Sequence, residues 1–324
     1  MADTGTEQFL RKCTLIVYGI GGNGLDLSEL RIRFSCKRSD NMTPNSAEIR
    51  VYNLAAETAL QIFSDYSPSV NFSTAQSSTK GRVILQAGYE SNFGVIFQGN
   101  IYQVIIGRES ATDTFVDLIC GDGHTAYNFA VVNTTLAKGN TPADQLTATS
   151  TAMQAKGVGQ GNVAAVKGNK LPRGKTLYGN AKNYMREIAQ NTNSSFSIQN
   201  EKTTFVPLTS YLPGTQVVLT SKTGLIGTPQ QTNEGINIKC LLNPLIKVGG
   251  LVNIDNASIQ DLQINISSKN SAANNIAPLS QDGVYYVLVV DYIGDTRGVD
   301  WYCNLRCLIS SPSSNPTNAV QVGG

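Results

Sequence analysis

The chain has 324 residues, of which 15% are charged, and its formal net charge is +2. That length allows two or three domains, each with a hydrophobic core of its own. The near-neutral charge argues against a protein whose main task is to hold nucleic acid through a strong basic patch, but it is compatible with a polar surface along which nucleic acid passes.

The first segment carries three glycines in the spacing of a dinucleotide-binding fingerprint. Gly19, Gly21 and Gly24 follow the apolar run "CTLIVY" in the order G-x-G-x-x-G. That fingerprint binds a pyrophosphate only where a helix begins at the third glycine. Residues 30–37, "LRIRFSCK", instead alternate apolar with mostly basic side chains, which is the period of a half-buried strand. We therefore predict a turn between two strands, with a nucleotide site as the alternative.

The remainder of residues 1–130 has the pattern of short strands and turns. Strands are predicted in "AEIRVYNL", "GRVILQAGY", "VIFQGNIYQVIIGRES" and "DTFVDLICGD". Ile49 and Val51 share one face of their strand, as do Val83 and Leu85. One short helix is predicted at 55–65. This pattern is typical of a barrel or a sandwich.

Residues 131–215 have a mixed α and β pattern. Thr141, Pro142 and Gly157 mark the cap, the first turn and the end of one helix. A second helix is predicted in "TLYGNAKNYMREIAQNTN". Its apolar stripe is Leu177, Ala181, Tyr184 or Met185, and Ile188. Two strands, "SSFSIQ" and "TTFVPL", complete this predicted α+β region.

Strands return in residues 216–310. They are predicted in "TQVVLTS", "GINIKCLLN", "GGLVNIDN", "IQDLQINIS", "DGVYYVLVVDYIGD" and "GVDWYCNLRCLIS", with "GDTRG" as the hairpin loop between the last two. Residues 311–324 are rich in Pro, Ser and Asn, and we predict a flexible tail. The stretches 43–54 and 228–244 share a Thr-Pro turn, an alternating strand and a following Asn, as two related β domains in one chain would.

A catalytic histidine is one candidate for chemistry. His124 is the only histidine, which excludes mechanisms that need two histidines and most zinc sites. It lies in "CGDGHTAY", where Asp122 or Cys120 is a possible catalytic partner. We interpret it instead as a turn residue.

A phosphate loop is a second candidate. "GNKLPRGKT" places Lys175 and Thr176 before the second predicted helix, but five residues rather than four separate Gly168 from Gly174. Successive N–H groups must curl around one anion, so a change of one residue breaks the cradle. We interpret the segment as a basic surface loop that contains Lys167, Lys170, Arg173 and Lys175.

A carboxylate cluster is a third candidate. Asp291, Asp295 and Asp300 lie near one hairpin end, where a hydrolase pair or a calcium site would fit. The spacing of a calcium loop is absent, and we interpret these residues as turn carboxylates. No residue is predicted to be catalytic, to bind a cofactor or to hold a metal.

Cysteine usage and hydropathy indicate the compartment. Six cysteines fall inside predicted strands, and we expect buried free thiols made in a reducing cytoplasm: Cys13, Cys36, Cys120, Cys240, Cys303 and Cys307. Cys303 and Cys307 lie about 13 Å apart along one strand, too far to share a metal or a bond. We expect neither a signal peptide nor a membrane span, because the first residues lack an apolar middle and the longest apolar run is short.

Three stretches resemble one family of proteins. Residues 30–59 resemble the opening barrel of baseplate hub proteins from contractile-tailed bacteriophages, with a strand, a "TPN" turn, an "I-x-V-Y-N-L" strand and a short helix in that order. Residues 224–255 resemble the start of that family's second barrel. The segment "TLYGNAKNYMREIAQNTNSSFSI" resembles the domain between the two barrels.

The resemblance implies a mainly β chain with a smaller α+β middle region. It implies a tail-tube-like β-barrel in 1–130, a middle domain in 131–215, a second barrel in 216–310 and a tail in 311–324. It also implies a homotrimer without catalytic residues, in which six barrels form a ring. Such a ring joins the six-fold tail tube to the three-fold central spike and leaves a channel for DNA.

The partners implied are the tail tube protein or a tube-terminating ring, the spike protein and other baseplate proteins. DNA is a partner only in transit. The location implied is the virion tail, after assembly in the host cytoplasm. Two alternatives stay open: a tail-associated hydrolase or carbohydrate-binding module that uses "GDTRGVD" or "CGDGHT", and a nucleotide-dependent enzyme that uses the glycine loops.

Overall fold

A computed structural model describes residues 9–19, 24–40, 43–66, 81–163, 166, 168–208, 210–214, 216–232, 235–259, 279–280 and 282–309. The chain is mainly β with a smaller α+β region in the middle, as predicted. The predicted strand 259–267, apart from its first residue, and the predicted tail 311–324 lie outside the described residues.

The described residues of the first part of the chain form seven strands and one helix. They are β1 (Arg11–Tyr18), β2 (Gly24–Asp26), β3 (Ile32–Ser39), β4 (Ser46–Tyr52), α1 (Ala56–Tyr66), β5 (Arg82–Tyr89), β6 (Asn92–Arg108) and β7 (Thr114–Gly121). The predicted pairs Ile49 and Val51, and Val83 and Leu85, are fully buried. Alternation of apolar and polar residues therefore predicted both the strands and their inner faces.

The glycine fingerprint connects two antiparallel strands. β1 pairs with β2, with Tyr18 opposite Gly24. Residues 20–23 between them, which include Gly21, lie outside the described ones. The second strand is the short β2, whereas β3, which we expected to follow directly, comes after a turn and pairs with β4. Gly24 begins a strand, and the fingerprint requires a helix that begins at its third glycine to bind the pyrophosphate.

The middle of the chain forms a unit with its own core. Its elements are α3 (His124–Phe129), β8 (Val131–Leu136), α4 (Pro142–Gln154), β9 (Gly159–Val163), β10 (Lys175–Asn180), α5 (Ala181–Asn191), β11 (Ser194–Ile198) and β12 (Lys202–Pro207). The predicted cap of α4 is confirmed, because Thr141 and Asp144 form a capping box and Pro142 opens the helix. The core of this unit includes Met153, Met185 and Phe196.

The second predicted helix begins later than expected. Residues 175–180 form strand β10, and α5 begins at Ala181, capped by the Asn180 side chain that accepts a bond from the Lys182 N–H. Leu177 is therefore buried on a strand rather than in the predicted helical stripe. The pairing of β10 with β8 decides this segment, and the sequence pattern of one strand does not reveal its partner.

The last part of the chain returns to strands. It contains β13 (Val217–Leu219), β14 (Gln230–Thr232), β15 (Gly235–Leu241), β16 (Leu251–Ile254), the 3₁₀-helix η1 (Asn256–Ser258), β17 (Val284–Asp295) and β18 (Trp301–Ile309). The final two strands form the predicted hairpin. No helix in the described part of the chain has the length and apolar character to cross a bilayer.

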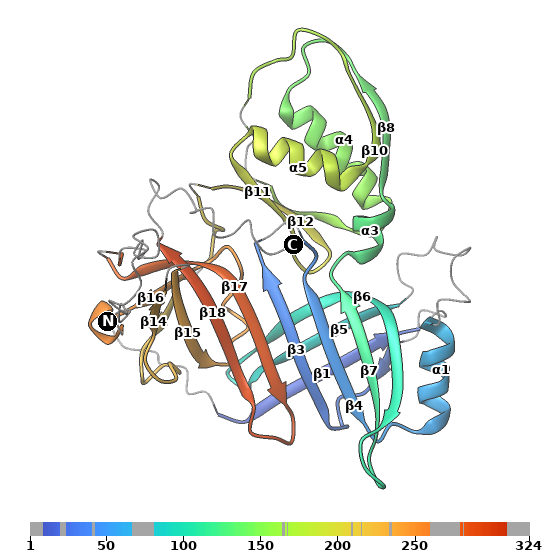
Figure 1. Cartoon of the computed structure of the whole chain (residues 1–324), viewed down its shortest axis with the longest axis vertical. Coiled ribbons are helices and arrows are strands. Elements are labelled where there is room, and N and C mark those ends of the chain that lie inside the picture. The colour runs from blue at the N-terminus through green and yellow to red at the C-terminus, as the bar shows by residue number, and fades with distance from the viewer. Residues whose placement is uncertain are drawn as a thin grey trace, which may run out of the picture.

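Strands from both ends of the chain form one sheet. Its order is β14-β15-β18-β17-β3-β4-β7-β6-β5-β1-β2. The strands from the first part of the chain and those from the last part meet where β17 pairs with β3. Figure 1 shows β18, β17, β3, β4 and β7 in one layer, with β1 and β5 crossing behind and the middle unit beyond one end of the strands. One continuous core lies under this sheet and draws on both ends of the chain. The division into two separate barrels stays a prediction.

The strand order is repeated within the chain. In the first part neighbouring strands follow the order β3-β4-β7-β6-β5, and in the last part the order is β14-β15-β18-β17-β16. The strands of each set also occur in the same order along the sequence, and every pair of neighbours in both sets is antiparallel. The similarity of residues 43–54 to 228–244 thus belongs to a repeated strand topology, since these segments contain β4 and β15.

Five of the six cysteines are buried, and Cys13 is partly buried. Burial raises the pKa of the Cys13 thiol to about 12 and those of Cys36 and Cys307 further. These three thiols are therefore protonated and weakly reactive at neutral pH.

Candidate functional site

A polar surface crosses six neighbouring strands, β15, β18, β17, β3, β4 and β7. On β3, Ile32, Phe34 and Cys36 are buried in the core, whereas Arg33 and Lys37 point to the opposite side and are exposed. The same alternation holds on β4 and β15. We call this second side the polar face. Its polar residues are Arg33, Ser35, Lys37, Ser46, Glu48, Arg50, Asp117, Asn237, Lys239, Asp291, Asn304 and Arg306.

Pairing between strands places these residues, together with Asp295 at the end of β17, in rows. Lys239, Asn304, Asp291 and Lys37 lie opposite one another across four strands. A second row contains Asp295, Arg33, Arg50 and Asp117. Each row mixes cations with carboxylates, so β3, which is basic by itself, lies within a face of both charges.

Local pairs neutralise much of this charge. Arg50 binds both oxygens of Asp117, at 2.7 and 2.9 Å, and its guanidinium lies 3.9 Å from the centroid of the Phe115 ring. Partial burial raises the pKa of Asp291, and the nearby Lys37 and Arg306 oppose that rise. The face is therefore polar and mixed in charge rather than strongly basic.

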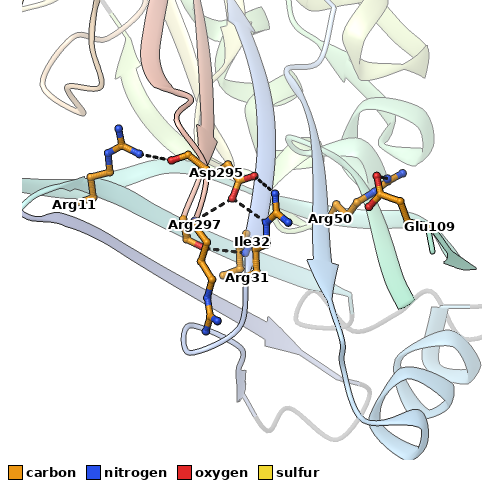
Figure 2. Close-up of polar contacts among 9 residues, drawn as sticks. Arg11, Arg31, Ile32, Arg50, Glu109, Asp295 and Arg297 are labelled. Carbon is orange, nitrogen blue, oxygen red and sulfur yellow. Dashed lines mark hydrogen bonds and ion pairs between the residues drawn. The ribbon is translucent and has the colours of Figure 1, made fainter. Parts of the chain in front are cut away.

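A second polar cluster joins the first part of the chain to the last part at the tip of the β17–β18 hairpin (Figure 2). Arg31, which precedes β3, binds Asp295 at the end of β17 through two bonds of 2.7 and 3.2 Å. Thr296 and Ile32 exchange two more bonds, and Arg11 donates to the Gly298 carbonyl at 2.7 Å. The bonds from Arg31 lower the pKa of Asp295. This cluster fixes the hairpin against β3 and β1.

The middle unit is held by the tip of its β11–β12 hairpin. Asn200 and Glu201 have positive φ values of 54° and 57°, as a two-residue hairpin turn requires. Their N–H groups each donate to Asp122 over 2.6 Å, and the Glu201 carboxylate reaches Arg82 at 2.8 Å. Gln199 accepts from Arg38 at 2.9 Å and donates to the Ser39 carbonyl. The hairpin tip is thus bonded to β3, β5 and the end of β7.

Asp40 connects three elements at the same contact. It follows β3, accepts from Ser195 on β11 at 3.1 Å and accepts from the hydroxyl of Tyr286 on β17. Burial raises the pKa of Asp40, although these bonds favour its charged form.

The histidine candidate is not assembled as a catalytic pair. His124 opens α3, stacks on Tyr102 with ring centroids 4.8 Å apart and contacts Asn128. Burial lowers its pKa. Asp122 is instead occupied by the hairpin tip, and burial raises its pKa to about 7. We therefore assign both side chains structural contacts.

The phosphate-loop candidate leads into a strand. Lys175 opens β10 and binds Glu187 at 2.7 Å and Gln145 at 3.1 Å. A phosphate loop requires a helix directly after its Lys-Ser/Thr pair. The lysine is therefore part of the packing between β10, α4 and α5.

The three aspartates are not brought together. Asp295 and Asp300 face each other at the hairpin, where the Asp295 N–H donates to the Asp300 carbonyl at 2.8 Å. Asp291 lies within β17, opposite Lys37. No group of three His, Cys, Asp or Glu residues suited to a metal occurs among the described residues.

Sequence reasoning missed the residues that hold the middle unit: Arg38, Asp40, Gln199, Glu201 and Asn45, whose side-chain amide donates to the Ile198 carbonyl at 2.8 Å. They lie far apart in the chain and follow no motif. Their one visible signal is an arginine, Arg38, at a position of β3 that the alternation assigns to the core.

Comparisons place this fold among known structures. Neither a protein-family profile nor a curated protein matches the sequence. The structure is similar to a 43 kDa tail protein of prophage MuSo2 from Shewanella oneidensis, with a TM-score of 0.56, 6% identity and coverage of 94% of this chain and 100% of that one.

Two further structures are similar. A tail protein from Neisseria meningitidis has a TM-score of 0.54 at 9% identity, with coverage of 91% and 96%. A component of the E. coli type VI secretion system, described as structurally similar to the bacteriophage T4 tail proteins gp27 and gp5, has a TM-score of 0.51 at 10% identity, with coverage of 86% and 73%. At these identities the likeness concerns the fold, and the chain has the fold of phage tail proteins.

Proposed function

We propose that the chain is a structural baseplate hub protein of a contractile phage tail. Three copies form a ring that adapts the six-fold tail tube to the three-fold central spike. DNA passes through the channel of this ring, and the location is the tail baseplate of the virion, after assembly in the host cytoplasm. The partners are the tube protein or a tube-terminating ring, the spike protein and other baseplate proteins.

The observation that carries this proposal is the polar face. It crosses strands from both repeats and is supported from behind by one core. A sheet that is solvated on one side suits the wall of an aqueous channel. The mixed charges of the rows around Lys37 and Arg50 give a wall that neither traps DNA nor strongly repels it.

The role is structural and not enzymatic. Asp122 and Asp295, one carboxylate from each of the two hydrolase candidates, are each occupied by hydrogen bonds within the chain. When the purified protein is incubated with peptidoglycan or with a bacterial surface polysaccharide, it should release no more reducing ends than buffer alone. If release occurred and His124→Ala abolished it while leaving assembly intact, the hydrolase alternative would replace this proposal.

The mass of the purified protein in solution tests the assembly. We expect a trimer, alone or once the spike protein is added, and capture of the tube protein by that complex. A stable monomer that binds neither component at micromolar concentrations would contradict the hub function.

A further inference from the structure

The repeated strand order extends to individual residues in the two long hairpins. In β6–β7 the register shifts between Ile101, opposite Cys120, and Gln103, opposite Ile119. In β17–β18 it shifts between Val287, opposite Cys307, and Val289, opposite Arg306. Each shift skips one residue, Tyr102 in β6 and Leu288 in β17. The two hairpins can therefore be aligned residue by residue, with the bulge residue Tyr102 of β6 equivalent to the bulge residue Leu288 of β17.

This superposition assigns an equivalent to each residue beyond the bulge. Ile105 of β6 corresponds to Asp291 of β17, and Ile106 corresponds to Tyr292. The same register carries over to the neighbouring strands. Thr232, opposite Gly235, takes the position of Lys37, opposite Ser46, so β14 corresponds to β3.

The equivalent strands differ in what lies beside them. The second half of β17, Val289–Asp295, pairs with β18 on one edge and β3 on the other. The second half of β6, residues 101–108, pairs with β7. In the described part of the chain no strand lies along its other edge, and the neighbouring element that contacts β6 on its outer side is the helix α1. β14 ends the same sheet at its other side, with β15 as its one strand neighbour among the described residues.

Exposure of side chains follows this difference. Tyr292 is 1% exposed, whereas its equivalent Ile106 is 42% exposed, as is Ile105. Tyr102, the bulge residue, is 41% exposed. An apolar strand edge that is open to water is a template for pairing with another strand.

We infer that residues 101–108 of β6 pair antiparallel with β14 of a second copy of this chain. The pairing repeats between copies the junction that β17 and β3 make within one copy. It is head-to-tail, so each copy uses its β6 edge toward one neighbour and its β14 edge toward the other, and a ring closes when the rotation allows. The inference rests on the proposed hub function and names the contact that builds its ring.

The internal junction also fixes the register between copies. Asp291 lies opposite Lys37 within the chain. Their equivalents, Ile105 of one copy and Thr232 of the next, should therefore lie opposite each other. Directly opposed residues in antiparallel strands have Cα atoms about 4.5–5.5 Å apart, which is within the range of a disulfide.

Disulfide trapping tests this register. The variant Ile105→Cys/Thr232→Cys is oxidised under mild conditions, and covalent dimers and trimers are measured on a non-reducing gel. The matched control is Ile105→Cys/Lys239→Cys, because Lys239 lies on β15, one strand further from the proposed contact. We expect roughly tenfold more cross-linked chain in the first variant than in the control, because one strand spacing adds about 4.8 Å and the four residues from Gly235, which is opposite Thr232, to Lys239 add about 13 Å along the strand.

A second variant tests the contact without new cysteines. Ile106→Lys places a charge at the contact, and we expect loss of the trimer with an unchanged far-ultraviolet circular dichroism spectrum. Trapping in the predicted register, together with this loss, supports the pairing. A trimer that gives no more cross-link than the control overturns the pairing and leaves the hub function standing. A monomer without cross-links, even with spike and tube proteins present, overturns both.

Discussion

Asp122 is a buried carboxylate and Asp40 a half-buried one at the contact between the middle unit and the sheet. Both accept several hydrogen bonds, yet burial raises the pKa of each because the charged form loses its hydration. Their bonds hold two hairpins and a strand end in one arrangement. These side chains make the contact specific in geometry and sensitive to pH.

The stability of the protein should fall as pH rises through the range in which Asp122 titrates. Its pKa is about 7 in the folded state and about 4 in the unfolded state, so the folded state binds more protons between these values. The stabilisation is complete below about pH 4 and is lost as pH approaches about 7. Asp40 acts in the same direction, and His124, whose folded pKa is lowered, acts in the opposite one.

Denaturant unfolding from pH 5 to pH 8 measures this effect. At pH 5 Asp122→Asn should be less stable than the wild type by about 1–3 kcal/mol, because an amide cannot accept both backbone N–H groups, and this difference should shrink as pH rises and the wild type loses stability. It should also lose most of the decline between pH 5 and pH 7. An unchanged slope in the variant would assign the decline to other groups.

Removal of the Arg31 side chain should destabilise the junction of the two repeats. Arg31→Ala leaves Asp295, whose side chain is 8% exposed, without its main partner. Since Arg31 itself is 43% exposed and screened by solvent, we expect a loss of about 1–2 kcal/mol.

A double-mutant cycle with Asp295→Asn, followed by chemical denaturation, isolates the Arg31–Asp295 pair. The contribution of Asp295 should vanish as pH falls below about 4, because its folded pKa is lowered. Additive losses from the two single variants would show that the pair contributes nothing.

At the scale of elements, local chemistry decided most of the structure. The Thr141 cap, the Pro142 start and the alternation of β3 and β4 are properties of neighbouring residues, and the sequence predicted them. The boundary between β10 and α5 was missed because β10 exists through its pairing with β8, some 40 residues away along the chain. Propensity in a strand depends on such partners.

The cap of α4 gives a prediction at this scale. Thr141→Ala removes the capping box with Asp144 and should cost about 1 kcal/mol in the free energy of unfolding. The control is Thr147→Ala on the exposed side of the same helix, where alanine should be neutral or slightly stabilising. Thermal unfolding followed by circular dichroism measures both. If both substitutions changed the free energy of unfolding by the same amount, the capping box would not stabilise the protein.

At the scale of the whole molecule, the sequence revealed the repeat but not the shared sheet. The similarity of residues 43–54 to 228–244 indicated two related β regions. Nothing in "LRIRFSCKR" or "VYYVLVVDYIGD" shows that β3 and β17 pair, because both have the pattern of any half-buried strand. The polar face could be predicted strand by strand, but its mixed charge follows from the order of the strands.

The mixed charge of the polar face predicts weak binding to DNA. The assembled wild-type protein should retain little double-stranded DNA in a filter-binding assay near physiological salt. Glu48→Lys, which removes an exposed carboxylate from the face and adds a cation, should increase retention several-fold in a salt-sensitive manner. Glu57→Lys on the exposed side of α1 makes the same charge change away from the face and should not. Strong retention by the wild type would contradict the neutral-channel hypothesis.

The junction between β17 and β3 has a consequence for biosynthesis. The partner of β3 follows it by about 250 residues, so a ribosome working at about 5–20 residues per second delivers it roughly 10–50 s later. Throughout that delay the nascent chain presents an open strand edge. The exposed Arg33 and Lys37 lie on that edge strand, where charge discourages pairing with other nascent chains. The cations that later line the polar face thus also act as gatekeepers during synthesis.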